Sequence, residues 1–121
     1  AELVMKSLKA GKHTFVEKPL AVNQEELNEI KAFYSSDIKN KPVLMTGFNR
    51  RFSPFSQEIK KHTDKRINPL FIQYRMNAGH IPLEHWVHES GGRIVGEGCH
   101  LVDLMTFFTG SKISSISVEK A

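Results

Sequence analysis

The chain has 121 residues, of which 40% are hydrophobic and 25% charged, a composition that is typical of a globular protein and excludes a disordered or collagen-like chain. The formal net charge of +4 comes from cations spread along the whole chain, so we expect no nucleic acid partner. A lone cysteine, Cys99, excludes an internal disulfide, and no apolar run reaches the roughly 18 residues of a membrane span, so we expect a cytoplasmic protein with no membrane partner.

The first predicted element is a helix over residues 1–10, with Gly11 as its C-terminal cap. A short strand follows over 13–17, where β-branched and aromatic residues are concentrated, and Pro19 ends it. Lys18 then lies at the carboxyl end of the strand, which is where open α/β sheets bind ligands. The alternative is an ordinary solvated lysine after an edge strand.

A second helix and a second strand are predicted next. Asn23 followed three residues later by Glu26 is a capping-box signature, and it predicts a helix that ends near Ser35. Residues 42–48 have the apolar composition of a buried strand. The order helix, strand, helix, strand is typical of the last part of a parallel nucleotide-binding sheet, and we assign residues 1–52 to this α/β domain.

The second half begins with a helix that Ser53 caps and Pro54 opens, and that ends in a cationic segment up to Lys65. A strand is predicted over 69–76 from its aromatic and β-branched residues. Residues 77–92 form a long irregular stretch, of the kind that often carries functional side chains.

The last predicted elements are a helix over 97–108, where apolar residues recur at helical spacing, and a strand over 113–118. Gly110 ends the helix. We therefore assign residues 53–121 to the first part of a second, α+β domain.

Three sequence blocks occur in order: Glu-Lys-Pro at 17–19, Gly-Phe-Asn-Arg-Arg-Phe at 47–52, and a glycine-rich block at 91–103 that ends in Gly-x-His-x-x-Asp. Together they resemble the Gfo/Idh/MocA family of NAD(P)-dependent sugar and cyclitol oxidoreductases, over essentially the whole chain. The resemblance implies hydride transfer between NAD or NADP and a secondary alcohol of a sugar, nucleotide sugar or cyclitol, in a homo-oligomer. It also implies the tail of a Rossmann-type parallel sheet, followed by part of a substrate and oligomerisation domain with a mostly antiparallel sheet.

Members of this family begin with a Rossmann segment that carries Gly-x-Gly-x-x-Gly, roughly a hundred residues before the lysine motif. Only 17 residues precede Lys18 here, and Gly96-x-Gly98 lacks the third glycine. Because that glycine-rich turn should dominate cofactor affinity, we expect a fragment that is inactive by itself and binds NAD(P) weakly or not at all.

The resemblance implies two catalytic residues, Lys18 and His100. The Lys18 ammonium would hydrogen-bond the reacting hydroxyl and stabilise negative charge on its oxygen, and His100 would accept the hydroxyl proton. A buried structural histidine is the alternative for His100. Glu17 would orient the lysine or the cofactor, and Pro19 would shape the turn, so we expect cofactor contacts from Glu17, Lys18 and Pro19.

One position departs from the family pattern. Many members have an aspartate four residues before the histidine, where this chain has Gly96. Glu97 is a helical neighbour of His100 and would orient the imidazole instead, and the alternative is an acid that only complements the helix dipole. The motif ends in Asp103, and we expect substrate contacts from Glu97 and Asp103.

Two further pairs of residues are candidates for ligand contacts. Asn49 and Arg51 follow a strand directly and suit a hydroxyl-rich or phosphate-bearing ligand, so we expect both to border the cofactor and the substrate. His85 and Trp86 are expected to line the substrate cleft, where an aromatic ring stacks on a sugar. The alternative is that Trp86 only anchors its loop.

Two other interpretations stay open. His80, His85 and His88 include a His-x-x-His spacing that suits zinc, but the chain has no second cysteine and we expect no metal. The other interpretation is a non-enzymatic interaction or regulatory module, in which the basic helix over 54–65 or an exposed sheet face binds a partner and the motifs are vestigial. The glycine at position 96 favours that alternative.

Overall fold

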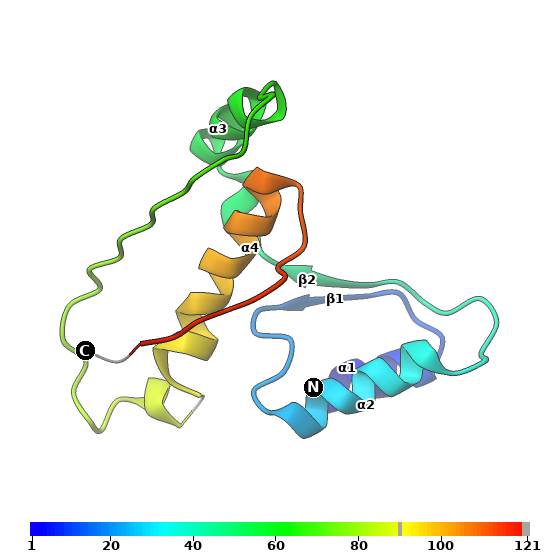
Figure 1. The fold of residues 1–121 in the computed structure, drawn as a ribbon. Coiled ribbons are helices and arrows are strands. Elements are labelled where there is room, and N and C mark those ends of the chain that lie inside the picture. Colours follow the sequence, from blue (N-terminus) through cyan, green and yellow to red (C-terminus); the bar gives the residue numbers. More distant parts are fainter. Residues whose placement is uncertain (90, 120–121) are drawn as a thin grey trace. The chain divides into compact units, whose positions relative to one another are not determined.

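The computed structural model describes residues 1–89 and 91–119 (Figure 1). These residues fall into two compact units, one of residues 1–48 with 79–99, and one of residues 49–78 with the chain from residue 100 onward. The helices and strands are α1 (Glu2–Lys9), β1 (Thr14–Glu17), α2 (Gln24–Ser35), β2 (Leu44–Gly47), α3 (Pro54–Asp64) and α4 (Cys99–Thr109). Three short helical segments are η1 (Asn49–Phe52) and η2 (Trp86–His88), which are 3-10 helices, and η3 (Ile94–Gly98), which is a π-helix.

In the first unit, β1 and β2 form a parallel pair in which Thr14 lies opposite Leu44 and Glu17 opposite Gly47. Helices α1 and α2 lie side by side (Figure 1), and their buried side chains make the core: Val4, Met5, Leu8, Ile30 and Phe33. Because side chains alternate along a strand, β1 places Val16 against this core and leaves Phe15 exposed. The predicted helix, strand, helix, strand order is confirmed.

Local capping residues set the ends of these helices. Gly11 follows α1 with a φ of +71°, a conformation that favours glycine, and its N–H donates to Leu8. Asn23 Oδ1 accepts a hydrogen bond of 2.9 Å from the Glu26 N–H, and Glu26 accepts one from the Val22 N–H. The predicted capping box is therefore present, with the return hydrogen bond moved one residue towards the N-terminus.

In the second unit, Ser53 caps α3 by accepting a hydrogen bond of 3.1 Å from the Ser56 N–H, as predicted. Gly110, with a φ of +65°, follows α4, and Arg66 Nη2 donates a 2.6 Å hydrogen bond to the terminal Thr109 carbonyl. The guanidinium supplies donors to carbonyls that the end of a helix leaves without intrahelical partners.

The structure differs from the prediction in three segments. Residues 69–76 and 113–118 form no strand within the described part of the chain, because a strand needs a hydrogen-bonded neighbour and residue types alone do not provide one. The last helix was expected to begin at Glu97, but helical winding precedes that residue, since η3 (Ile94–Gly98) leads directly into α4. Gly91, with a φ of +90°, supplies the turn before this winding.

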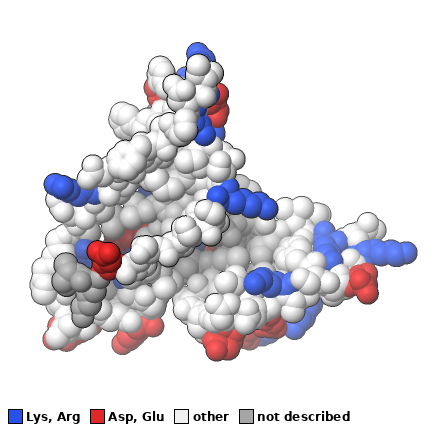
Figure 2. All heavy atoms as spheres, in the orientation of Figure 1, with Lys and Arg blue, Asp and Glu red and all other residues white. Residues whose placement is uncertain are grey.

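No helix among the described residues is long and apolar enough to cross a membrane. On the face drawn in Figure 2, lysines and arginines occur at separate places, with acidic side chains between them.

Candidate functional site

Lys18 directly follows β1 in the first unit, and its half-buried side chain reaches a segment 78 residues further along the chain. The Lys18 Nζ donates a hydrogen bond to the backbone carbonyl of Gly96, within η3. The Cys99 thiol lies 3.8 Å from the same carbonyl oxygen, a weak contact. The peptide bond between Lys18 and Pro19 is cis. The ammonium is thus held by a backbone acceptor rather than left in solvent.

Glu17 and Pro19 flank the lysine and have different surroundings. Glu17 is exposed, and its Oε2 lies only 2.9 Å from where a Cβ at Gly47 would be, so the glycine at the end of β2 leaves room for the carboxylate. Pro19 lines an open cavity of about 380 Å³, together with Phe48 and Val95 and the loop that leads into α2. The residues that follow the two strands therefore border one cavity within the first unit.

The segment η3 follows two glycines with positive φ, Gly91 and Gly92. A Cβ at Gly91 would lie 2.9 Å from Val95 Cγ2, so only glycine fits there without displacing Val95. A Cβ at Gly96 would meet only Val87 Cγ2, at 4.0 Å, which is an ordinary contact. Glu97 is half-buried in the same segment. Turns of π-helix are rare and often mark functional sites.

His85 and Trp86 lie together in the first unit, with ring centroids 5.3 Å apart. His85 Nδ1 accepts a 3.2 Å hydrogen bond from the Val87 N–H and so caps η2. Trp86 is 67% exposed, whereas Val87 is buried. Of these two neighbouring side chains, the buried one is thus Val87. His88 Nε2 lies 3.2 Å from the Pro82 carbonyl.

The second unit contains the other predicted site residues. The Arg51 Nε donates a 3.0 Å hydrogen bond to one carboxylate oxygen of Asp103, and its Nη2 donates to the other. This hydrogen bond, followed by the Coulomb attraction of the carboxylate, raises the pKa of the Arg51 guanidinium above its ordinary value against the opposing effect of burial. The guanidinium carbon also lies 5.3 Å from the centre of the Phe107 ring. Asn49 is exposed at the start of η1.

His100 is buried in α4, with 5% of its surface exposed, on the same side of the helix as Asp103 and Leu104. The predicted site residues therefore divide between the units. The first unit holds Glu17, Lys18, Pro19, His85, Trp86 and Glu97, and the second holds Asn49, Arg51, His100 and Asp103. Within the part of the chain that is described, no group of three or more histidine, cysteine or acidic side chains is placed to hold a metal ion.

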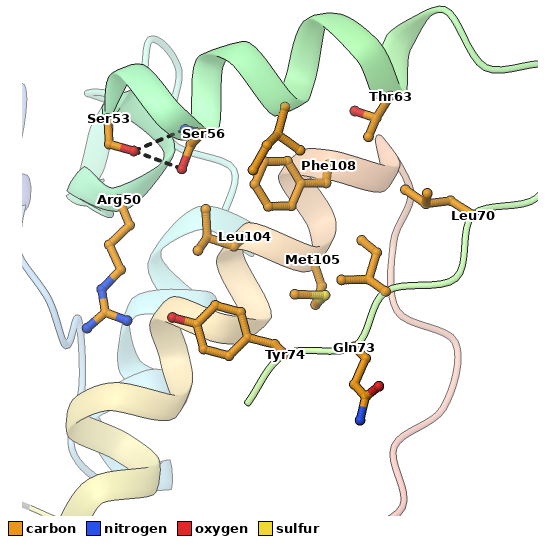
Figure 3. Close-up of a pocket in the computed structure, with 12 residues that line it drawn as sticks. Arg50, Ser53, Ser56, Thr63, Leu70, Gln73, Tyr74, Leu104, Met105 and Phe108 are labelled. Carbon is orange, nitrogen blue, oxygen red and sulfur yellow. Dashed lines mark hydrogen bonds between the residues drawn. The ribbon is translucent and has the colours of Figure 1, made fainter. Parts of the chain in front are cut away.

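Two features were not expected from the sequence. One is the hydrogen bond from Lys18 to the Gly96 carbonyl, because residue types do not show which backbone oxygen accepts a hydrogen bond. The other is a cavity of about 470 Å³ in the second unit, between α3, α4 and the extended run around residue 72. Figure 3 shows Leu104, Met105 and Phe108 lining it, with the Arg50 guanidinium near one end. The helical spacing of the α4 residues and the alternation of Leu70, Ile72 and Tyr74 are the sequence signals of its apolar walls.

Comparison with known proteins indicates one family of oxidoreductases. Residues 1–48 match the family model described as "Oxidoreductase family, NAD-binding Rossmann fold". The scyllo-inositol 2-dehydrogenase (NAD(+)) of Bacillus subtilis is 29% identical to the chain, over 96% of the chain and 34% of the relative. Residues 1–48 thus match the Gfo/Idh/MocA family of oxidoreductases, and the relatives extend the similarity over nearly the whole chain. The Rossmann-type fold expected for its first half and the NAD(P) cofactor class are thereby confirmed.

Other relatives are similar to the chain over a comparable share of its length. The inositol 2-dehydrogenase/D-chiro-inositol 3-dehydrogenase of Lactiplantibacillus plantarum is 30% identical, over 97% of the chain and 33% of the relative. A putative oxidoreductase, YceM, of Salmonella typhimurium is 41% identical, over 91% of the chain and 33% of the relative. The chain thus spans about a third of the length of the curated relatives it matches. No solved structure matches it significantly.

Proposed function

We propose that the natural protein carrying this chain is a dehydrogenase that transfers a hydride between NAD or NADP and a secondary alcohol of a cyclitol or sugar. The observation that carries the proposal is the hydrogen bond from Lys18 to the Gly96 carbonyl, which holds an ammonium at the carboxyl end of a Rossmann strand. Two relatives named as inositol dehydrogenases, both matched over nearly the whole chain, support a cyclitol as the first substrate class to test.

The residues after β1 fit a nicotinamide cofactor. The cavity beside Pro19 has walls of Leu20, Phe48 and Val95, which suit a flat ring, and Pro19 directly follows Lys18 in the chain. Glu17, Pro19, Asn49 and Arg51 are the proposed cofactor contacts along with Lys18. When bound, NAD(P) supplies the hydride acceptor or donor.

In this proposal, Lys18 stabilises charge on the reacting oxygen and His100 accepts the proton. The ammonium donates a hydrogen bond to the reacting oxygen and stabilises the negative charge that develops there. His100 Nδ1 or Nε2 accepts the hydroxyl proton as the substrate is oxidised. His100 is followed three residues later by Asp103, which the proposal places at the substrate together with Asn49, Arg51, His85, Trp86 and Glu97.

The test uses the natural full-length protein, assayed with NAD+ and NADP+ against scyllo-inositol, other inositols and simple sugars. We expect Lys18→Met and His100→Asn each to lower kcat by about 10²–10⁴-fold, the usual contribution of a group that moves a proton or stabilises charge. Lys12→Met is the matched control, because Lys12 is an exposed lysine in the turn before β1. An unchanged kcat in Lys18→Met would remove the lysine from the mechanism.

One form of the alternative, a regulatory module, binds its partner through the charges of the helix over 54–65. In α3, however, Lys60 pairs with Asp64 at 2.7 Å and Lys61 with Glu58 at 2.9 Å. The Lys61 hydrogen bond lowers the pKa of Glu58, so the Glu58 carboxylate stays charged near neutral pH. Cations that are paired within their own helix attract an anionic partner weakly, which favours the enzyme.

The proposal extends to the second half of the protein and to its assembly. In the run 70–76, Leu70, Ile72 and Met76 are half-buried, whereas Phe71 is 88% exposed. This alternation suits one strand of an antiparallel sheet, with residues 113–118 as another, in a substrate and oligomerisation domain over 53–121 that follows a cofactor domain over 1–52. We expect a cytoplasmic homo-oligomer, and Phe71→Lys should lower the mass that light scattering gives for the natural protein.

A further inference from the structure

We propose that the main-chain carbonyl of Gly96 is the positioning group for Lys18, in place of an acidic side chain. The inference rests on the proposed function, in which Lys18 acts on the substrate oxygen. It concerns the position at which this chain departs from the pattern of the family it resembles, where a glycine stands four residues before His100.

The contact is specific in its geometry. Lys18 Nζ donates to the Gly96 oxygen, although 78 residues separate the two. An ammonium has three N–H donors, so one bond to the carbonyl fixes its direction and leaves two donors for a ligand. A carbonyl is also neutral, and the charge on Lys18 is therefore not compensated by its own positioning group. That charge remains available to an oxygen on which negative charge develops.

Because residue 96 is a glycine, the group through which it meets Lys18 is its main-chain carbonyl. A Cβ at this position would meet only Val87 Cγ2, at 4.0 Å. This is an ordinary van der Waals distance, so the contact with Val87 does not determine which group of residue 96 meets the lysine. The contact that the structure gives to Lys18 at this position is the one to the main-chain carbonyl.

The backbone around Gly96 is held from its N-terminal side. Gly91 has a φ of +90°, and its missing Cβ lets Val95 pack 2.9 Å from where that Cβ would be. Gly96 follows Val95 directly in the π-helical segment η3. The turn at Gly91 therefore sets where η3 begins and, through it, where the carbonyl lies.

The experiment reads the carbonyl itself by NMR of the natural full-length protein. Glycine labelled with ¹³C at the carbonyl and glutamate labelled with ¹⁵N select the peptide groups of Gly-Glu pairs, which occur once in this chain, at Gly96-Glu97. We expect the Gly96 carbonyl resonance to move in Lys18→Met, because the hydrogen bond is lost, and to stay in place in Lys12→Met. An unmoved resonance in Lys18→Met overturns the inference.

A second measurement needs no variant and covers the case in which Lys18→Met does not fold. Reductive methylation of the wild-type protein, read by peptide mass spectrometry, should modify Lys18 about tenfold more slowly than the exposed Lys12, a difference that corresponds to about 1.4 kcal/mol. Equal rates overturn the inference.

The outcomes separate this inference from the proposed function. If the natural protein transfers no hydride with any substrate and the resonance still moves, the proposed function fails and the positioning contact stands. If Lys18→Met abolishes activity without moving the resonance, the catalytic role of Lys18 stands and Gly96 is not its positioning group.

Discussion

At the scale of single residues, Arg51 and Asp103 form an ion pair in the second unit whose carboxylate is buried. Asp103 is buried, and the guanidinium gives it two parallel hydrogen bonds. We expect Asp103→Asn to lower the free energy of unfolding by about 1–3 kcal/mol, because the amide keeps the shape but loses the charge and one acceptor for the guanidinium. Urea denaturation of the natural protein measures this.

Asp64→Asn is the control for that variant. Asp64 pairs with Lys60, but its side chain is 58% exposed, so the loss should be within about 0.5 kcal/mol. If both substitutions cost the same, the buried pair contributes no more than a surface pair. A rise in KM for Asp103→Asn beyond the change in stability would support its proposed role at the substrate.

The neighbouring residues Trp86 and Val87 separate a ligand contact from a packing contact. Trp86→Ala should change stability by less than about 0.5 kcal/mol, because the indole is largely exposed, and should raise KM for the cyclitol or sugar. Val87→Ala removes a buried side chain and should cost about 1–2 kcal/mol. Thermal unfolding and steady-state kinetics distinguish the two. A large loss of stability in Trp86→Ala would restore the interpretation that Trp86 anchors the loop.

At the scale of elements, the cap of α2 gives a direct test of local chemistry. Asn23→Ala removes the acceptor of the Glu26 N–H and should cost about 1 kcal/mol. Asn28→Ala is the matched control, since it removes only the exposed hydrogen bond from Gln24, expected to contribute about 0.2–0.5 kcal/mol. Similar losses in the two variants would mean that the cap contributes little.

Substitution of the two glycines that precede η3 tests whether they set the position of this segment. Gly91 and Gly92 both have positive φ, at +90° and +71°, so alanine strains the backbone at either position. Only at Gly91 would the new Cβ also collide with Val95. We therefore expect Gly91→Ala to lower kcat about tenfold with little change in KM, because it shifts the carbonyl that positions Lys18. Gly92→Ala should keep kcat closer to wild type, and an equal loss in both would assign the effect to backbone strain.

These elements also show what the sequence predicts and what it does not. The caps at Gly11, Asn23 and Ser53 were predictable because each depends on one residue and its neighbours within a few positions. The π-helical winding of η3 was not, since it depends on the packing of Gly91 against Val95. The hydrogen bond between Lys18 and Gly96 joins distant segments through a backbone atom, and no pattern of residue types records it.

At the scale of the whole molecule, the parallel pair β1–β2 has one covered face and one apolar face that the described residues leave open. Phe15 and Met45 lie opposite each other on that open face, 62% and 48% exposed. Parallel sheets are normally covered on both faces, and unpaired strand edges bind other strands. The arrangement of these two residues follows from the strand register, which sequence alternation alone does not determine.

We therefore expect a polypeptide of residues 1–121 to self-associate and to bind NAD(P) more weakly than the natural protein does. The sequence has no Gly-x-Gly-x-x-Gly turn for the pyrophosphate, and the apolar pair Phe15 and Met45 offers a surface for contact between copies. Light scattering across a range of concentrations measures the first effect, and calorimetric titration with NAD+ and NADP+ measures the second.

Met45→Lys should reduce self-association, because it places a charge on the exposed face, whereas Lys12→Met should not. A monomer at every concentration would show that this face does not mediate association, and binding as tight as in the natural protein would show that the cofactor is held without the glycine-rich turn.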